Sequence, residues 1–154
     1  ILFNSAYPLT IAMVTKDFKE TDSGLEYIGT DRQQIGDGGF IAQFTEVDSG
    51  RVIAATSEEW KYLVVQRAPL DPSCVDSSDP ESDCMFEAVA EPSNWRSTGF
   101  DDSGWSRATA YTEEQVGTKD GYGTINWDQA ASLIWSSDLK LDNTILWRHA
   151  VKNS

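Results

Sequence analysis

Short strand-like segments separated by clusters of turn residues make up most of the chain, and this pattern constrains its fold more than any other feature. Each segment is apolar, or alternates apolar and polar residues, and Gly, Asp, Ser and Pro stand between the segments. The clearest segments are Leu9–Val14, Phe40–Phe44, Arg51–Thr56, Trp60–Val65 and Asn143–Val151. Such spacing is typical of antiparallel sandwiches and barrels, so we predict an all-β fold, an antiparallel β-sandwich.

Two of these segments predict a β-hairpin, because the turn residues Asp48-Ser49-Gly50 lie between Phe40–Phe44 and Arg51–Thr56. The last segment alternates, so one face of its strand should carry Ile145, Trp147, His149 and Val151. A helical period is weak throughout the chain. The best candidate for a helix is a turn or two around Gln129–Ile134.

The size and charge of the chain exclude several classes of protein. It has 154 residues, with 25 Asp and Glu against 12 Lys and Arg, and its formal net charge is −13. This length corresponds to one ordinary domain, so we predict a single domain over residues 1–154. Nucleic acid is not an expected partner, because phosphate binding needs a stripe of Lys and Arg, and no two basic residues are adjacent here. No apolar run approaches the roughly 18 residues that cross a bilayer, so we expect no membrane span.

The two cysteines, Cys74 and Cys84, lie in the most acidic and most loop-like part of the chain, at about residues 69–92. This acidic loop has no Lys or Arg between its seven carboxylates, which are Asp71, Asp76, Asp79, Glu81, Asp83, Glu87 and Glu91. Such a segment cannot fold through its own apolar contacts, and a disulfide would tie it down. The alternative is a zinc site, but two cysteines and the distant His149 do not match a zinc-ligand spacing. A persistent disulfide implies an oxidising compartment, so we expect a secreted, extracellular or cell-surface protein.

Several sequence motifs follow one another in an order that resembles a known family. Gly38–Phe44 reads GGFIAQF, Ala55–Lys61 reads ATSEEWK, and Phe100–Trp105 reads FDDSGW. Asn94-Trp95 precedes the third motif, and Asn143–Arg148 closes the series. Over roughly residues 8–150 this order resembles the galactose-binding-like jelly rolls that are appended to secreted glycoside hydrolases. The resemblance implies a jelly roll that binds sugars, binds calcium structurally, contacts other proteins or supports a neighbouring domain.

The chain departs from the family pattern near its start, where only eight residues precede the segment Leu9–Val14. Family members usually carry further strands at this point. We therefore expect a sandwich with incomplete N-terminal strands, or an edge that a strand from a neighbouring chain completes. The corresponding alternative function is a structural subunit of a self-assembling extracellular structure or filament.

The aromatic residues divide into strand and loop positions. Trp95, Tyr122 and Trp127 lie in loops rich in Gly, Asn and Asp. Loop aromatics can stack on sugar rings, so these three are the candidate carbohydrate-binding residues, although tryptophans also plug the ends of sandwiches. The tryptophans in strand-like segments are expected in the core, and they are Trp60, Trp135 and Trp147.

The two carboxylates of the FDDSGW motif have two interpretations. Asp101 or Asp102 can cap a single turn, with the flanking aromatic rings pointing inward. Alternatively, both are ligands of a calcium ion, the one cofactor that the sequence suggests. Neighbouring acidic pairs are poor candidates for acid–base catalysis, because adjacent residues on a strand point to opposite faces.

These observations predict a secreted, non-catalytic β-sandwich module. Its expected partner is a carbohydrate or another extracellular protein, and its other expected role is to support an adjoining domain. A hydrolase is the third hypothesis, behind the module and the assembly subunit.

Overall fold

The computed structural model describes residues 1–119 and 121–151, which form an all-β protein with antiparallel sheets, as the strand-like pattern predicts. The strands are β1 Leu9–Lys16, β2 Leu25–Glu26, β3 Gln34–Ile35, β4 Gln43–Thr45, β5 Val52–Ala55, β6 Lys61–Arg67, β7 Glu87–Ala88, β8 Ser106–Arg107, β9 Thr109–Tyr111, β10 Leu133–Trp135 and β11 Asp142–Val151. Within the described residues, one sheet has five strands in the order β1-β11-β6-β7, with β8 also paired to β6. The other strands form the two-stranded ladders β2-β3, β4-β5 and β9-β10.

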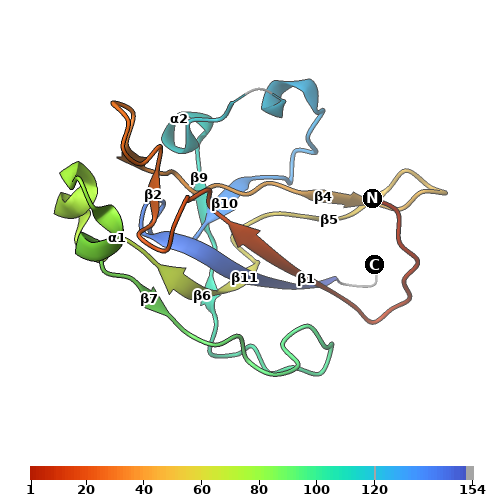
Figure 1. Cartoon of the computed structure of the whole chain (residues 1–154). Helices are drawn as coiled ribbons and strands as arrows, with labels where there is room; N and C mark the ends of the chain where they lie inside the picture. Colours follow the sequence, from red (N-terminus) through yellow and green to blue (C-terminus); the bar gives the residue numbers. More distant parts are fainter. Residues whose placement is uncertain (120, 152–154) are drawn as a thin grey trace.

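The strand β11 is the centre of the five-stranded sheet (Figure 1). It pairs with β1 in an unbroken register from Leu9 opposite Val151 to Lys16 opposite Thr144. On its other side it pairs with β6, with irregularities in the register near Thr144. The strands predicted from the apolar runs Leu9–Val14 and Trp60–Val65 and from the alternation along Asn143–Val151 are therefore confirmed, and they are neighbours in one sheet.

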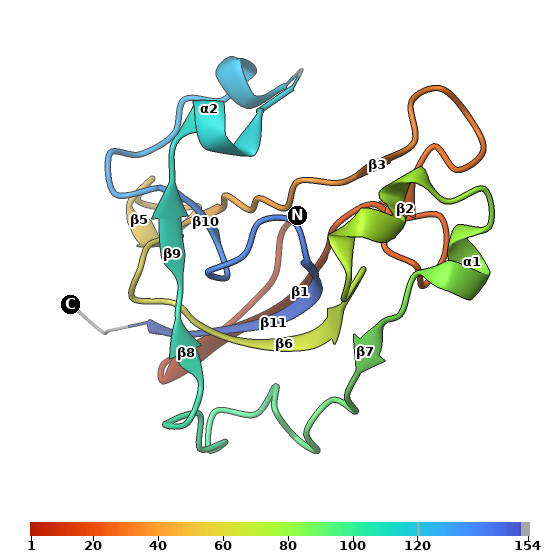
Figure 2. The same ribbon diagram turned by 90° about the vertical axis from the view of Figure 1, so that its left-hand side faces the viewer.

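A second layer lies over one face of this sheet. Figure 1 draws β4, β5 and β10 above β1, β11 and β6, and Figure 2 shows β5 and β10 in the same position. An isolated bridge between Phe40 and Ile134 links the segment before β4 to β10. The predicted hairpin is confirmed as the β4-β5 ladder. The connectivity of a jelly roll stays a prediction.

The main core fills the space between the two layers and is built around tryptophan. The predicted core residues Trp60, Trp135 and Trp147 are all buried, and the rings of Trp135 and Trp147 lie 6.1 Å apart. Each indole N–H donates a hydrogen bond, from Trp60 to the Ala55 carbonyl, from Trp135 to the Asp142 carbonyl, and from Trp147 to the Thr15 hydroxyl. The rings therefore add apolar burial without leaving buried donors unpaired.

The predicted helical turn at Gln129–Ile134 is wrong, because this segment leads into β10. The residues of β10 are all buried, and they pair with Thr109–Tyr111 of β9. This segment forms a strand because it is buried on both sides and pairs with a distant strand. The local sequence pattern contains information on neither of these contacts. The described helices are short and lie elsewhere, at 3-10 helix η1 Pro72–Asp76, α1 Pro80–Asp83, α2 Glu113–Val116 and 3-10 helix η2 Tyr122–Thr124.

The predicted disulfide between Cys74 and Cys84 is confirmed, with the two Cα atoms 5.5 Å apart. It joins η1 to the end of α1, and Cys84 is buried although most of the acidic loop is exposed. The loop thus has a cross-link where it lacks a core of its own.

The chain before β1 forms no strand, and residues 1–8 are all exposed. Strand β1 pairs only with β11 in the described part of the chain, so it is an edge strand of the sheet. The expectation that a neighbouring chain completes this edge stays a prediction. None of the described helices is long and apolar enough to cross a membrane.

Candidate functional site

Two of the three predicted ligand aromatics lie together in one loop. Tyr122 is in η2, and Trp127 follows it with a ring-centroid distance of 6.1 Å. The Trp127 indole N–H donates to the Tyr122 carbonyl at 3.2 Å, which fixes one ring against the other. Both side chains are partly exposed. We call residues 121–130 the aromatic loop, and its two rings form a small apolar platform at the surface.

Polar groups hold and surround the aromatic loop. The Asp128 backbone N–H donates to the Gln43 side-chain oxygen at 2.8 Å, which ties the loop to β4. Partial burial and the negative charge of Glu113 raise the pKa of the Tyr122 hydroxyl, so this hydroxyl stays a neutral donor and acceptor. Aromatic faces beside fixed polar groups are the chemistry with which proteins bind small polar ligands that carry apolar faces.

The third predicted ligand aromatic, Trp95, lies elsewhere, in the core. It is 1% exposed and packs with Val65 and Leu146 in a second apolar cluster. Its indole N–H donates to Glu91 at 2.8 Å, and the Arg96 guanidinium lies 4.4 Å from a ring centroid. In both views the segment before β8 runs along the bottom of the molecule, whereas α2 and the aromatic loop lie at the top (Figures 1 and 2). The structure therefore does not bring Trp95 together with Tyr122 and Trp127.

The two carboxylates of the FDDSGW motif already have protein partners. Asp101 accepts a hydrogen bond from the Ser103 N–H at 2.9 Å, the turn-capping arrangement that the motif allows. Asp102 accepts one bond from Lys61 at 2.9 Å and one from Arg148 at 2.8 Å. Partial burial opposes ionisation of Asp102, but these two cations hold the pKa of its carboxyl below the usual range.

Arg148 is the centre of this arrangement. Its side chain is 3% exposed, and its guanidinium also donates to the carbonyls of Trp95 and Ser97. The ion pair of Asp102 and Arg148 and the hydrogen bonds of Arg148 thus hold the loop around Trp95 against β11. Two cations neutralise Asp102, which leaves it a poor ligand for calcium. Among the described residues, no group of three or more His, Cys, Asp or Glu side chains could hold a metal ion.

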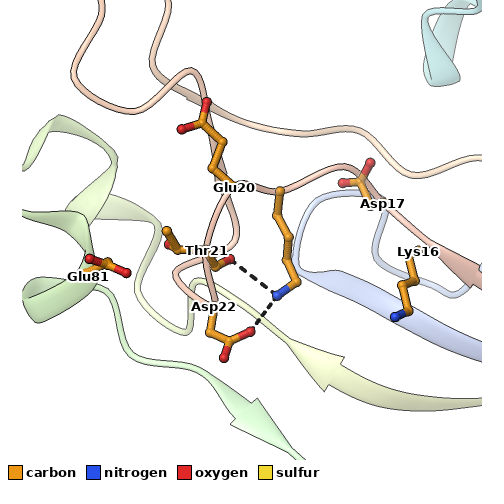
Figure 3. A pocket seen from close by; sticks show the side chains of 7 residues that line it. Lys16, Asp17, Glu20, Thr21, Asp22 and Glu81 are labelled. Carbon is orange, nitrogen blue, oxygen red and sulfur yellow. Dashed lines mark hydrogen bonds and ion pairs between the residues drawn. The ribbon is translucent and has the colours of Figure 1, made fainter.

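A groove of about 480 Å³ follows the end of β1 (Figure 3). Its wall is polar, and Lys19 donates to Asp22 at 2.6 Å and to the Thr21 carbonyl at 3.3 Å. Glu81 reaches the groove from α1 (Figure 3). The sequence patterns do not predict this groove, because its two sides come from β1 and from the acidic loop.

Asp17, at one end of the groove, is an unusual carboxylate. Its Oδ2 atom is buried and has no hydrogen-bond partner within the described protein. Burial raises the pKa of Asp17 to about 6, and the negative charges of Glu26 and Asp37 add to the effect. A Cβ on residue 36 would stand 2.6 Å from Asp17 Oδ2 and 2.9 Å from Glu26 Oε1. Both carboxylates therefore face the same small space beside the backbone of Gly36.

Asn143 lies opposite Asp17 on the neighbouring strand. The Asp17 N–H donates to the Asn143 carbonyl at 2.7 Å, one step beyond the last paired residues of β1 and β11. Opposite residues of antiparallel strands project to the same face, so the two side chains are neighbours. Asn143 is completely buried, yet neither its Nδ2 nor its Oδ1 has a partner. Among described residues, every buried side-chain nitrogen or oxygen without a partner belongs to Asp17 or Asn143.

In the part of the chain that the structure describes, buried oxygens without partners gather at this pair. Carboxylate and amide oxygens are ligands that calcium accepts, and a buried polar atom without a partner is costly. The register that places Asn143 beside Asp17 depends on two strands from opposite ends of the chain. No local motif carries this information, so sequence patterns alone could not have found the pair.

No protein-family model, curated protein or solved structure matches the chain. The galactose-binding-like resemblance therefore stays a prediction, and the chemistry of the residues alone supports a function.

Replacing Asp102 by alanine should destabilise the protein by about 2 kcal/mol, because the buried Arg148 then loses its carboxylate partner. Urea unfolding followed by tryptophan fluorescence measures the change. Asp101→Ala is the matched control, since its carboxylate is exposed and contacts no cation in the described structure, and its unfolding midpoint should move little. Equal effects of the two substitutions would contradict the stabilising role of the ion pair between Asp102 and Arg148.

Replacing Asp17 by asparagine should remove one component of the pH dependence of stability. The folded pKa of about 6 lies above the ordinary aspartate value of 3.8, so ionisation of Asp17 costs stability as the pH rises between these values. At neutral pH, Asp17→Asn should therefore be more stable than the wild type by about 1 kcal/mol, allowing for solvent screening of this partly exposed group. Urea unfolding across this range tests it, with the exposed Asp31→Asn as control. A difference that does not change with pH would refute it.

Proposed function

We propose that the chain is a secreted, non-catalytic β-sandwich module that binds carbohydrate through the aromatic loop. The observation that carries the proposal is the partly exposed pair of rings formed by Tyr122 and Trp127. Sugar rings present apolar C–H faces, and a fixed aromatic platform stacks on them at low cost in conformational entropy. The Tyr122 hydroxyl and the carboxylate of Glu113 supply hydrogen-bonding groups beside the platform.

The proposed ligand is a neutral sugar. The protein carries a net charge of −13, and Glu113 is near the aromatic platform. Sulfated, phosphorylated or uronic sugars would meet repulsion from this charge, and neutral hexoses would not.

The proposed module is non-catalytic because the carboxyl groups that the structure describes do not match those that glycoside hydrolysis needs. Glycoside hydrolysis uses two carboxyl groups placed on either side of the bound sugar, one of them kept protonated near neutral pH. Among described carboxyl groups, Asp17 has a pKa raised to about 6, and it lies after β1 and not in the aromatic loop. The proposed secretion is supported by the Cys74–Cys84 disulfide, since such bonds persist in oxidising compartments.

Replacing Trp127 by alanine should weaken binding of neutral oligosaccharides by about tenfold, because an aromatic stacking contact contributes roughly 1–1.5 kcal/mol. A glycan array identifies the best neutral oligosaccharide, and isothermal titration calorimetry then measures the dissociation constant. Phe18→Ala is the matched control, since it removes an exposed aromatic ring that contacts Tyr27 and not the aromatic loop. Wild-type protein that binds no sugar on the array, or binding that survives Trp127→Ala, would refute the proposal.

We also propose that a structural calcium ion, the expected cofactor, binds at Asp17 and Asn143 with Glu26, and not at Asp101 and Asp102. The support is the set of buried oxygens without partners at the first site and the two cations that neutralise Asp102. A bound cation would neutralise the carboxylates that burial and mutual repulsion make costly to ionise.

Calcium should raise the midpoint of thermal unfolding of the wild type at neutral pH, relative to protein in chelator, because a ligand that binds only the folded state stabilises it. Asp17→Asn should lose most of this increase, whereas Asp101→Asn should keep it. Differential scanning calorimetry measures all three proteins. An equal midpoint with calcium and with chelator for the wild type, or loss of the increase in Asp101→Asn alone, would overturn this assignment.

A further inference from the structure

The edge of the five-stranded sheet at β7 is open and exposed. All residues from Met85 to Glu91 are exposed, and we call this segment the β7 edge. Residues 87 and 88 pair with β6, and the Val89 N–H donates to the Val65 carbonyl at 2.9 Å. Because N–H groups alternate in direction along a strand, the Ala88 N–H points away from β6. In the described structure β7 has no strand on that outer side.

Apolar side chains line the β7 edge. The side chains of Met85, Phe86 and Val89 are 67%, 46% and 51% exposed. Leu70 is also exposed, and its backbone N–H donates a hydrogen bond to the Met85 carbonyl. A groove of about 210 Å³ runs beside them, lined by residues of β6 and by Glu87 and Val89. An exposed edge strand with apolar side chains is a template for another strand, and proteins normally block such edges.

Negative charge predominates around the β7 edge. The acidic loop carries seven carboxylates and no Lys or Arg, and all seven are exposed. Arg67 and Arg96, which lie beside the β7 edge, are each bound to a carboxylate of this chain, Arg67 to Asp142 at 2.7 Å and Arg96 to Glu91 at 3.0 Å. The Cys74–Cys84 disulfide cross-links η1 to the end of α1, so part of this charge is held in place before a partner arrives.

We propose that the β7 edge binds an extended segment of a partner protein in which apolar residues alternate with Lys or Arg. The segment would add to the sheet as a strand beside β7, with its apolar side chains on Met85 and Val89, which the alternation of the strand places on one face, and its cations on the acidic loop. This surface is distinct from the aromatic loop, which lies at the opposite end of the molecule in both views (Figures 1 and 2). Carbohydrate binding and this interaction are therefore separate.

Charge and position disfavour the other occupants. A second copy of the chain would bring a second set of seven carboxylates against the first, which costs free energy. The exposed apolar residues at the start of the chain are placed elsewhere, since the Phe3 ring lies 6.4 Å from that of Phe44 in β4. A basic partner with apolar side chains satisfies both the exposed apolar residues of the β7 edge and the excess of carboxylates in the acidic loop.

The probe is a fluorescently labelled peptide of alternating valine and lysine, titrated with the full chain and followed by anisotropy. We expect saturable binding that weakens at high salt. Met85→Ser with Val89→Ser should weaken it by about tenfold, and so should Ala88→Pro, which removes the outward N–H. The matched controls are Ala88→Ser and a peptide of alternating glycine and lysine, which keeps the charge without the apolar side chains. Circular dichroism checks that each variant is folded.

Several results would overturn the proposal. Equal binding of the glycine–lysine peptide would show adsorption by charge alone. Unchanged binding in both the serine and the proline variants would place the peptide elsewhere. A wild-type dimer in analytical ultracentrifugation that Met85→Ser with Val89→Ser dissociates would make a second copy the occupant of the β7 edge.

Discussion

The burial of β11 on both faces is the constraint on which the rest of the structure depends. One face carries Trp147 into the main core between the two layers, and the other carries Leu146 into the second cluster with Trp95. Pairing with β1 and β6 satisfies its backbone, so no edge of this strand is open. A strand buried on four sides must place any polar side chain against a specific partner, because solvent cannot supply one.

The polar side chains of β11 differ in whether they have a hydrogen-bond partner. This difference separates the residues that stabilise the fold from those that form a candidate binding site. Arg148 is nearly fully buried and is satisfied by Asp102 and by loop carbonyls, which fixes the segment around Trp95. Asp142 is satisfied by Arg67. Asn143, between them in the chain, has no side-chain partner, and neither has the facing oxygen of Asp17. The residues that complete their hydrogen bonds stabilise the fold, and the pair that does not is the place where a bound group would contribute most.

The sequence predicts the strands well and the sites partially, for a physical reason. The alternation along Asn143–Val151 and the apolar run Leu9–Val14 are local properties, so they identify strands without knowledge of their partners. The burial of Trp95 depends on Arg148, and the strand at Ile134 depends on pairing with β9 and Phe40, which only the folded chain brings together. Tyr122 and Trp127 could be predicted as a pair because the residues that orient them are close in sequence.

The uneven distribution of charge gives the two proposed surfaces different partners. At the aromatic loop, negative charge beside Tyr122 disfavours acidic sugars and leaves neutral ones. At the β7 edge, a loop of carboxylates surrounds apolar residues on an open strand, which favours a cationic segment that can pair its backbone. The two surfaces use different elements and lie at opposite ends of the molecule (Figures 1 and 2). A module built this way could hold a sugar and a protein at once, because neither partner would cover the site of the other.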